Sequence, residues 1–290
     1  MERFKKVKIA SIAGIIGNIF LSIIKIVIGI ISNSQAMIAD AINSISDVFS
    51  SLMTFIGNKI ASVPSDDCHN LGHGKAEYIY SMLISNVMFV MGFIVVKDSF
   101  VTLFNPEKYH FSSWLILVCL ITIIVKLSLY IYTSNIYKKY NNLLIKANSK
   151  DHRNDILITS FNLISCILAK YDIYFFDSIT GIGISIWILI TAYKIFKESY
   201  DVLMDKSISD ETKNEVYKII NEHKEIKKVI HFNSTPVGYK YQISFTIYVD
   251  GNLSTFESHD IANKLEKEIG SKIEEIYLTV IHVNPLEEDK

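Results

Sequence analysis

The stretch Ser149-Lys-Asp-His-Arg-Asn-Asp155 places two aspartates, Asp151 and Asp155, four residues apart at the start of an apolar run. That run, Ile156–Ala169, holds only 14 uncharged residues, whereas a helix that crosses a bilayer needs roughly 20. A helix that crosses here must draw its first turns from the charged stretch, which puts Asp155 and also Asp151 at membrane depth. Ionisable side chains at that depth are costly and generally mark an ion pathway.

The rest of the chain divides into an apolar part and a polar part. Half of the 290 residues are hydrophobic, and the mean hydropathy is +0.28. Long apolar runs fill residues 9–200, whereas the C-terminal part has the composition of a soluble protein. We therefore predict a membrane domain over residues 1–204 and a soluble domain over residues 205–290. The net charge of -1 gives no indication of nucleic acid as a partner. The three cysteines form no CxxC pair, so neither a disulfide framework nor a zinc finger is indicated.

Five other apolar segments accompany the opening stretch, so that six membrane-spanning helices are predicted. They cover about residues 7–31, 36–62, 76–104, 111–137 and 178–196. An even number of spans puts both termini on one side of the membrane. Lysine and arginine are denser on that side than on the other, which holds Lys97, Lys108 and Lys170. Because positive residues gather on the cytoplasmic side, we expect both termini in the cytoplasm.

The C-terminal part predicts a small α+β domain. Ser209 begins a helix with acids in its first turn, and residues 255–270 form a second amphipathic helix. Three strands are expected, at residues 229–233, 239–250 and 276–283, with a turn at Pro236-Val-Gly238. The resulting order α-β-β-α-β indicates a sheet with both helices on one face.

A second polar pair in the chain matches the first. Asn43 and Asp47 are also four residues apart, and the short uncharged stretch after Asp47 places it within the second span. Residues at this spacing lie on one face of a helix. If the two spans face each other, three carboxylates and one amide meet. Oxygen ligands suit Mg²⁺, Ca²⁺ and Mn²⁺, while imidazole and thiolate suit Zn²⁺, Cu²⁺ and Ni²⁺. Alternatively, the acids cap helices at the membrane surface.

Two further sets of residues are candidate metal ligands. The loop after the second span carries Asp66, His69 and His73, although a solvated polar loop has a similar composition. The soluble part holds three single histidines near strand ends or on a helix, which are weaker candidates because such residues often lie on the surface: His231, His259 and His282.

Four motifs together resemble the cation diffusion facilitator family. Ser34-x-Ala36-x-x-Ala-Asp-Ala-x-Asn-Ser-x-x-Asp47 is similar to the family's second-span motif. Pro64-x-Asp-Asp-x-His-x-x-Gly-His-Gly-Lys-Ala-Glu77 is similar to its loop, and Ala147-Asn-Ser-Lys-Asp-His-Arg-Asn-Asp155 to its fifth span. Ile281-His-Val-Asn-Pro285 resembles the end of its metallochaperone-like domain. The resemblance implies a homodimeric antiporter of a divalent cation and protons in the cell membrane. It also implies six spans and a cytoplasmic α+β domain.

The family's transport site corresponds by position to Asn43, Asp47, Asp151 and Asp155. Zinc-transporting members have histidine or aspartate at the position of Asn43 and histidine at the position of Asp151. The chain is therefore similar to the manganese-exporting branch, and the resemblance implies a Mn²⁺/H⁺ antiporter. Export of Zn²⁺, Fe²⁺ or Co²⁺ is the alternative within the family.

The resemblance also implies a role for the other candidate ligands. It assigns Asp66, His69 and His73 to a loop metal site and the three histidines of the soluble part to a further site. Thr246 stands where zinc-type members have a histidine, and Asn284 where they have an aspartate, which argues against a tight binuclear zinc site. A charge pair that links the spans to the dimer interface corresponds to Lys75 and Asp205.

Two other functional classes fit the sequence less well. A membrane metalloenzyme built on the histidine loop lacks a HExxH-like pair or a nucleophile with a base. A membrane-anchored metal sensor has no need of charged residues inside its spans. We therefore expect a transporter, with no enzyme activity and no organic cofactor.

Overall fold

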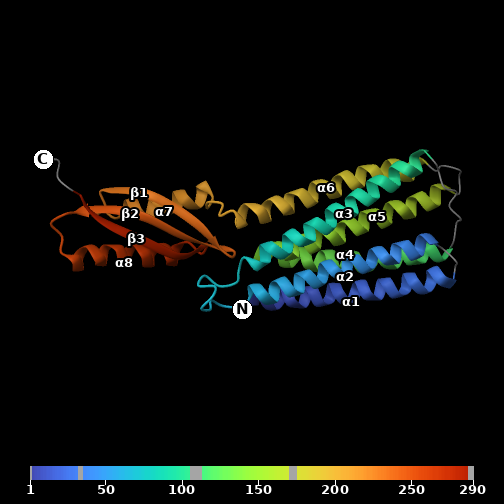
Figure 1. Cartoon of the computed structure of the whole chain (residues 1–290), viewed down its shortest axis with the longest axis horizontal. Coiled ribbons are helices and arrows are strands. Elements are labelled where there is room, and N and C mark those ends of the chain that lie inside the picture. The colour runs from blue at the N-terminus through green and yellow to red at the C-terminus, as the bar shows by residue number, and fades with distance from the viewer. Residues whose placement is uncertain (1, 32–34, 105–112, 170–174, 287–290) are drawn as a thin grey trace. The chain divides into compact units, whose positions relative to one another are not determined.

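The structure, a computed structural model, describes residues 2–31, 35–104, 113–169 and 175–286 and consists of two compact units (Figure 1). One unit comprises residues 1–62 and 76–200, and the other comprises residues 63–75 and 201–290. The loop after the second predicted span therefore groups with the C-terminal part. The predicted division into domains at residues 204 and 205 stays a prediction.

Six long helices of the described residues run side by side in the first unit, and each predicted apolar segment overlaps one of them (Figure 1). They are α1 (Glu2–Ile31), α2 (Gln35–Ala61), α3 (Ala76–Phe104), α4 (Ser113–Tyr140), α5 (Leu143–Ala169) and α6 (Phe175–Leu203). By length and composition, α1, α3 and α4 contain segments that can cross a membrane: Glu2–Ile28, Ala76–Val101 and Ile116–Tyr140. The count of six spans stays a prediction, because among the described residues only these three of the six helices contain such a segment.

The helical unit buries many polar residues between its helices and exposes many large apolar residues. Large apolar side chains are exposed along the helices, among them Ile16, Ile124 and Trp187. The buried positions include many small polar side chains, among them Ser11, Asn18, Ser51, Thr54, Ser81, Thr133 and Asn148. Small and polar residues between helices and apolar residues toward the surroundings are typical of a bundle embedded in lipid.

A buried acid at the start of α3 connects three helices. Glu77 is 1% exposed and accepts from Arg3 Nη2 of α1 at 2.6 Å. Its second oxygen accepts from the backbone N–H of Leu143, the first residue of α5, at 2.6 Å. The first backbone N–H groups of a helix have no partner within the helix, so Glu77 also caps α5.

The second unit contains the predicted α-β-β-α-β order. Its elements are α7 (Asp210–Glu222), β1 (Lys228–Val237), β2 (Lys240–Asp250), α8 (Thr255–Lys272) and β3 (Ile276–Leu286). The central strand β2 pairs antiparallel with β1 and parallel with β3. Alternate residues of β2 are buried against both helices in one apolar core, which includes Ile219, Ile243, Phe245, Ile247 and Leu265.

The ends of these elements follow from local sequence. Ser209 caps α7, and Ser254 and Glu257 form a capping box at the start of α8. Strand β1 continues through Pro236, where the sequence predicts a turn, because β1 is an edge strand and can accommodate a residue without an N–H. The chain turns at Gly238 instead, where φ is 63°.

Candidate metal sites

Three aspartates from two helices meet inside the helical unit. Asp47 lies on α2, while Asp151 and Asp155 lie one turn apart on α5. One carboxylate oxygen of each lies within 4.8 Å of the other two. Asp47 is 7% exposed and Asp155 is 9% exposed. The two helices therefore gather three acids away from bulk water, as the spacing requires if α2 and α5 face each other.

This group of three carboxylates, the aspartate cluster, could hold a metal ion. Asp151 Oδ2 is buried and has no hydrogen-bond partner among the described residues. A buried carboxylate oxygen of this kind is costly unless a cation or a proton binds it. The fourth predicted ligand, Asn43, lies on α2 one turn before Asp47, but its side chain lies outside the described part of the structure.

A lysine from α4 binds two members of the aspartate cluster. Lys126 Nζ lies 2.6 Å from Asp47 Oδ2 and 2.5 Å from Asp155 Oδ2, and the residue is 1% exposed. Lys126 was not among the predicted site residues, and the oxygen-only group of the prediction is therefore incomplete. Its signal in the sequence was a single lysine inside the apolar segment 111–137, because ionisable residues at membrane depth generally have partners.

Lys126 also lines a small pocket. It is lined by residues of α1, α2, α4 and α5: Lys25, Asp47, Thr122, Lys126, Asp155, Ile158 and Thr159. Lys25 is also buried, and it donates to Ser44 Oγ at 2.9 Å. The hydroxyl of Thr122 is buried and has no hydrogen-bond partner among the described residues. The pocket therefore combines two ammonium groups, two acids and a free hydroxyl.

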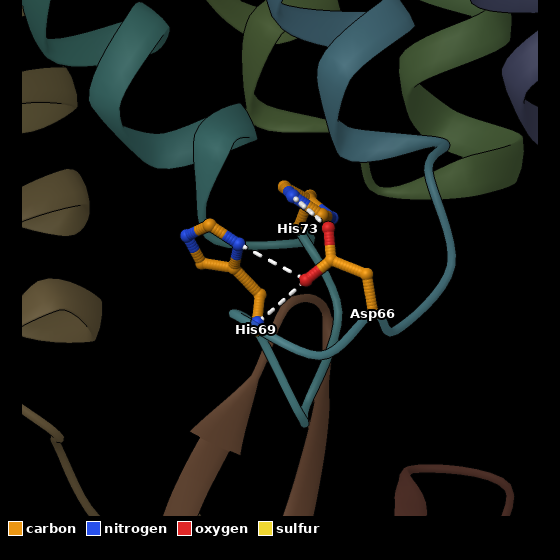
Figure 2. A group of neighbouring side chains, drawn as sticks. All are labelled: Asp66, His69 and His73. Carbon is orange, nitrogen blue, oxygen red and sulfur yellow. Dashed lines mark hydrogen bonds and ion pairs between the residues drawn. The ribbon is translucent and has the colours of Figure 1, made fainter.

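A second group of ligands lies in the loop between α2 and α3. Figure 2 shows the Asp66 carboxylate with one oxygen toward the imidazole ring of His69 and the other toward that of His73. His69 Nδ1 lies 3.3 Å from Asp66 Oδ1, and His73 Nε2 lies 3.4 Å from Asp66 Oδ2. The backbone N–H of His69 donates to Asp66 at 2.6 Å and lowers the pKa of its carboxyl. The loop thus brings together all three residues predicted for it, with two imidazoles and one carboxylate.

Tight backbone geometry holds this loop together. Gly72 has a φ of 75° and donates from its backbone N–H to His69 O at 2.8 Å. A Cβ atom at Gly74 would lie 2.7 Å from Gly238 Cα in the β1–β2 turn. Lys75 Nζ lies 2.7 Å from Asp205 Oδ1, so these two residues form an ion pair within the second unit.

The histidines of the C-terminal part are separate from both groups. Among the described residues, His231, His259 and His282 belong to neither the aspartate cluster nor the loop group. His231 has a φ of 55° and lies at the irregularity of β1, between Ile230 and Asn233. Their role as ligands stays a prediction. His282 pairs with Thr246 across β2 and β3, so the threonine noted in the sequence stands next to a candidate ligand.

Comparisons with known proteins cover nearly the whole chain. Residues 11–204 match the family described as cation efflux transmembrane domain, and residues 208–286 match the cation efflux protein cytoplasmic domain. An uncharacterized transporter of Methanocaldococcus jannaschii is 31% identical, over 94% of this chain and 96% of that protein. The manganese efflux system protein MneS of Bacillus subtilis is 29% identical, over 99% of this chain and 100% of that protein. The cation-efflux pump FieF of Shewanella oneidensis is 25% identical, over 97% of this chain and 95% of that protein.

Proposed function

The chain belongs to the cation diffusion facilitator family of cation efflux proteins, and from this premise we propose that it exports Mn²⁺ from the cytoplasm in exchange for protons. The family consists of membrane transporters of divalent cations and not of enzymes. The proposal for this chain concerns three points: which ion it transports, whether transport is coupled to protons, and which residues bind the ion and the protons.

The aspartate cluster carries the proposal for manganese. Its described members provide carboxylate oxygens and neither imidazole nor thiolate. Oxygen ligands favour Mn²⁺ over Zn²⁺, Ni²⁺ and Cu²⁺ relative to sites that contain nitrogen or sulfur. Asn43, the fourth proposed ligand, is also an oxygen donor. The description of MneS as a manganese efflux protein agrees with this choice.

The proposed cycle uses the repulsion between neighbouring acids. A divalent ion that enters from the cytoplasm removes the repulsion of Asp47, Asp151 and Asp155 and binds between α2 and α5. After outward release, protons neutralise the same carboxylates for the return step. Both termini and the C-terminal domain lie in the cytoplasm in this proposal, and the protein works as a homodimer in the cell membrane.

The loop and C-terminal residues have a supporting role in the proposal. The loop group of Asp66, His69 and His73 binds a metal ion on the cytoplasmic side, and Lys75 and Asp205 fix the end of that loop. His231, His259 and His282 contribute at most a weak metal site, because Thr246 and Asn284 replace two ligands of the zinc-type members.

Transport in proteoliposomes tests the choice of ion. Purified protein is reconstituted, and metal flux is measured for Mn²⁺, Fe²⁺, Co²⁺ and Zn²⁺ with and without an opposing pH gradient. We expect the largest flux for Mn²⁺, accompanied by proton movement in the opposite direction. A larger flux for Zn²⁺, Fe²⁺ or Co²⁺ would instead support the alternative exporter, and a Mn²⁺ flux without proton movement would refute the antiport.

A further inference from the structure

We infer that Lys126 is a tethered cation of the transport site: its ammonium group binds Asp47 and Asp155 while no metal is present, and a divalent substrate must displace it. The inference rests on the proposed function of the aspartate cluster. It adds a residue that determines both how tightly metal binds and which ions can enter.

The Lys126 ammonium occupies two of the three carboxylates that a metal at the aspartate cluster would bind. Lys126 Nζ lies 2.6 Å from Asp47 Oδ2 and 2.5 Å from Asp155 Oδ2, so one nitrogen joins an acid of α2 to an acid of α5. A metal at the aspartate cluster would bind the same two carboxylates, together with Asp151. Two cations at one set of oxygens repel each other strongly in a buried place, so the ammonium has to leave when the metal binds.

The pocket beside the cluster can receive the displaced ammonium group. Thr122 stands four residues before Lys126 on α4 and therefore lies on the same face of that helix. Side chains on a helix lean toward its N-terminus, which is the direction of Thr122 from Lys126. The Thr122 hydroxyl is buried, lines this pocket and has no partner among the described residues. It supplies a hydrogen-bond acceptor for the ammonium without a net charge.

The tether also explains how the site can reject monovalent ions. A sodium or potassium ion that replaced the ammonium would bring the same charge, and it would have to compete with a group held at a high effective concentration. A divalent ion brings one additional positive charge to the three acids. A divalent ion such as Mn²⁺ can therefore displace the Lys126 ammonium from the acids, whereas Na⁺ cannot.

A structural ion pair makes a different prediction for the charge-conserving variant Lys126→Arg. If Lys126 served only to neutralise the buried acids, arginine would do so equally, and the Kd for Mn²⁺ would stay unchanged. If Lys126 competes with the metal, an arginine that is harder to displace raises that Kd. The response of Kd to Lys126→Arg, beside that to Lys126→Met, therefore separates the two roles.

The test measures Mn²⁺ binding to the full-length protein by titration calorimetry, together with KM and kcat for flux. For Lys126→Met we expect Kd to fall about tenfold, a change of about 1.4 kcal/mol. We also expect KM and kcat to fall together, and Na⁺ to compete with Mn²⁺ in this variant alone. Lys146→Met is the control: it removes a half-buried lysine of α5 that pairs with Glu198, outside both the aspartate cluster and this pocket. We expect its Kd to change less than about threefold, because charge effects weaken with distance.

A charged variant tests the inference if the neutral variant does not fold. Arginine binds two carboxylates with its planar fork and is harder to displace than an ammonium, so Lys126→Arg is expected to raise Kd about threefold or more. An unchanged or raised Kd for Lys126→Met, or an unchanged or lowered Kd for Lys126→Arg, would overturn the inference while the proposed function stands. Wild-type protein that binds no Mn²⁺ would refute the proposed function itself.

Discussion

At the scale of single residues, Asp151 is the position where the choice of metal is expected to be decided. It stands one turn before Asp155 on α5, and its Oδ2 atom is buried without a partner among the described residues. The family resemblance places a histidine here in zinc-transporting members. No hydrogen bond from a described residue competes with a metal ion for this oxygen. Replacing the side chain therefore changes a ligand of the ion.

The variant Asp151→His tests this role. Because imidazole favours Zn²⁺ more than Mn²⁺, we expect the ratio of Zn²⁺ flux to Mn²⁺ flux to rise about tenfold. Flux of both ions in proteoliposomes measures the ratio. Asp98→His, on α3 and outside the aspartate cluster, is the control and should leave the ratio unchanged. A ratio that stays constant in Asp151→His would show that Asp151 does not determine the choice of metal.

The residue scale is also where the sequence was least informative. The four-residue spacing on two helices predicted that Asp47, Asp151 and Asp155 would meet if the two spans faced each other, and in the structure the three acids do meet. The binding of Lys126 to two of them could not be predicted. A lone lysine in an apolar segment has a partner somewhere, but the partner depends on how α4 is rotated against α2 and α5.

At the scale of elements, Glu77 holds the ends of three helices together. Its carboxylate accepts from Arg3 on α1 and from the backbone of Leu143 at the start of α5. From the sequence, Glu77 is an ordinary interfacial charge at the beginning of a span. Its burial depends on the approach of α1 and α5, which no local pattern encodes.

The variant Glu77→Gln is expected to lower the stability of the helical unit. Removing one member of a buried ion pair leaves the other charge unpaired, which costs about 3–5 kcal/mol. Thermal unfolding in detergent measures the change. Glu2→Gln is the control, because Glu2 is exposed and lies 3.8 Å from Lys139, also exposed; its unfolding temperature should equal that of the wild type. Equal unfolding temperatures for both variants would contradict the structural role of Glu77.

The order of helices and strands could be predicted from the sequence, whereas the residues at which they begin and end were harder to predict. Apolar runs predicted all six helices, and the order of strands and helices in the C-terminal part was also predicted. Strand β1 extends past its predicted end to Val237, because an edge strand accommodates Pro236. The pairing of β2 with β3 in parallel depends on α8 as the connection between them.

At the scale of the whole molecule, the loop between α2 and α3 belongs to the C-terminal unit. Gly74 of this loop meets Gly238 of the β1–β2 turn so closely that a Cβ at residue 74 would lie 2.7 Å from Gly238 Cα. Both contacting groups are backbone atoms, so neither can move aside as a flexible side chain does. The loop group of Asp66, His69 and His73 therefore depends on the C-terminal part for its position.

The variant Gly74→Ala is expected to separate the loop from the turn. Faster amide hydrogen exchange should appear in residues 63–75, and metal binding by the loop group should weaken. Gly270→Ala is the control within the same unit, because no atom lies within 4 Å of a Cβ placed there. If exchange in the loop of Gly74→Ala matched that of the wild type, the contact would have no role in holding the loop.

The central claim is that the aspartate cluster of α2 and α5 carries Mn²⁺ across the membrane. Mn²⁺ flux into proteoliposomes, compared between the wild type and Asp155→Ala, tests it most directly. Asp67→Ala serves as the matched control. It also removes an aspartate, but Asp67 lies in the exposed loop and belongs to neither the aspartate cluster nor the loop group. We predict flux in the wild type and in Asp67→Ala, and flux at the level of empty liposomes in Asp155→Ala. Wild-type flux in Asp155→Ala would contradict the claim.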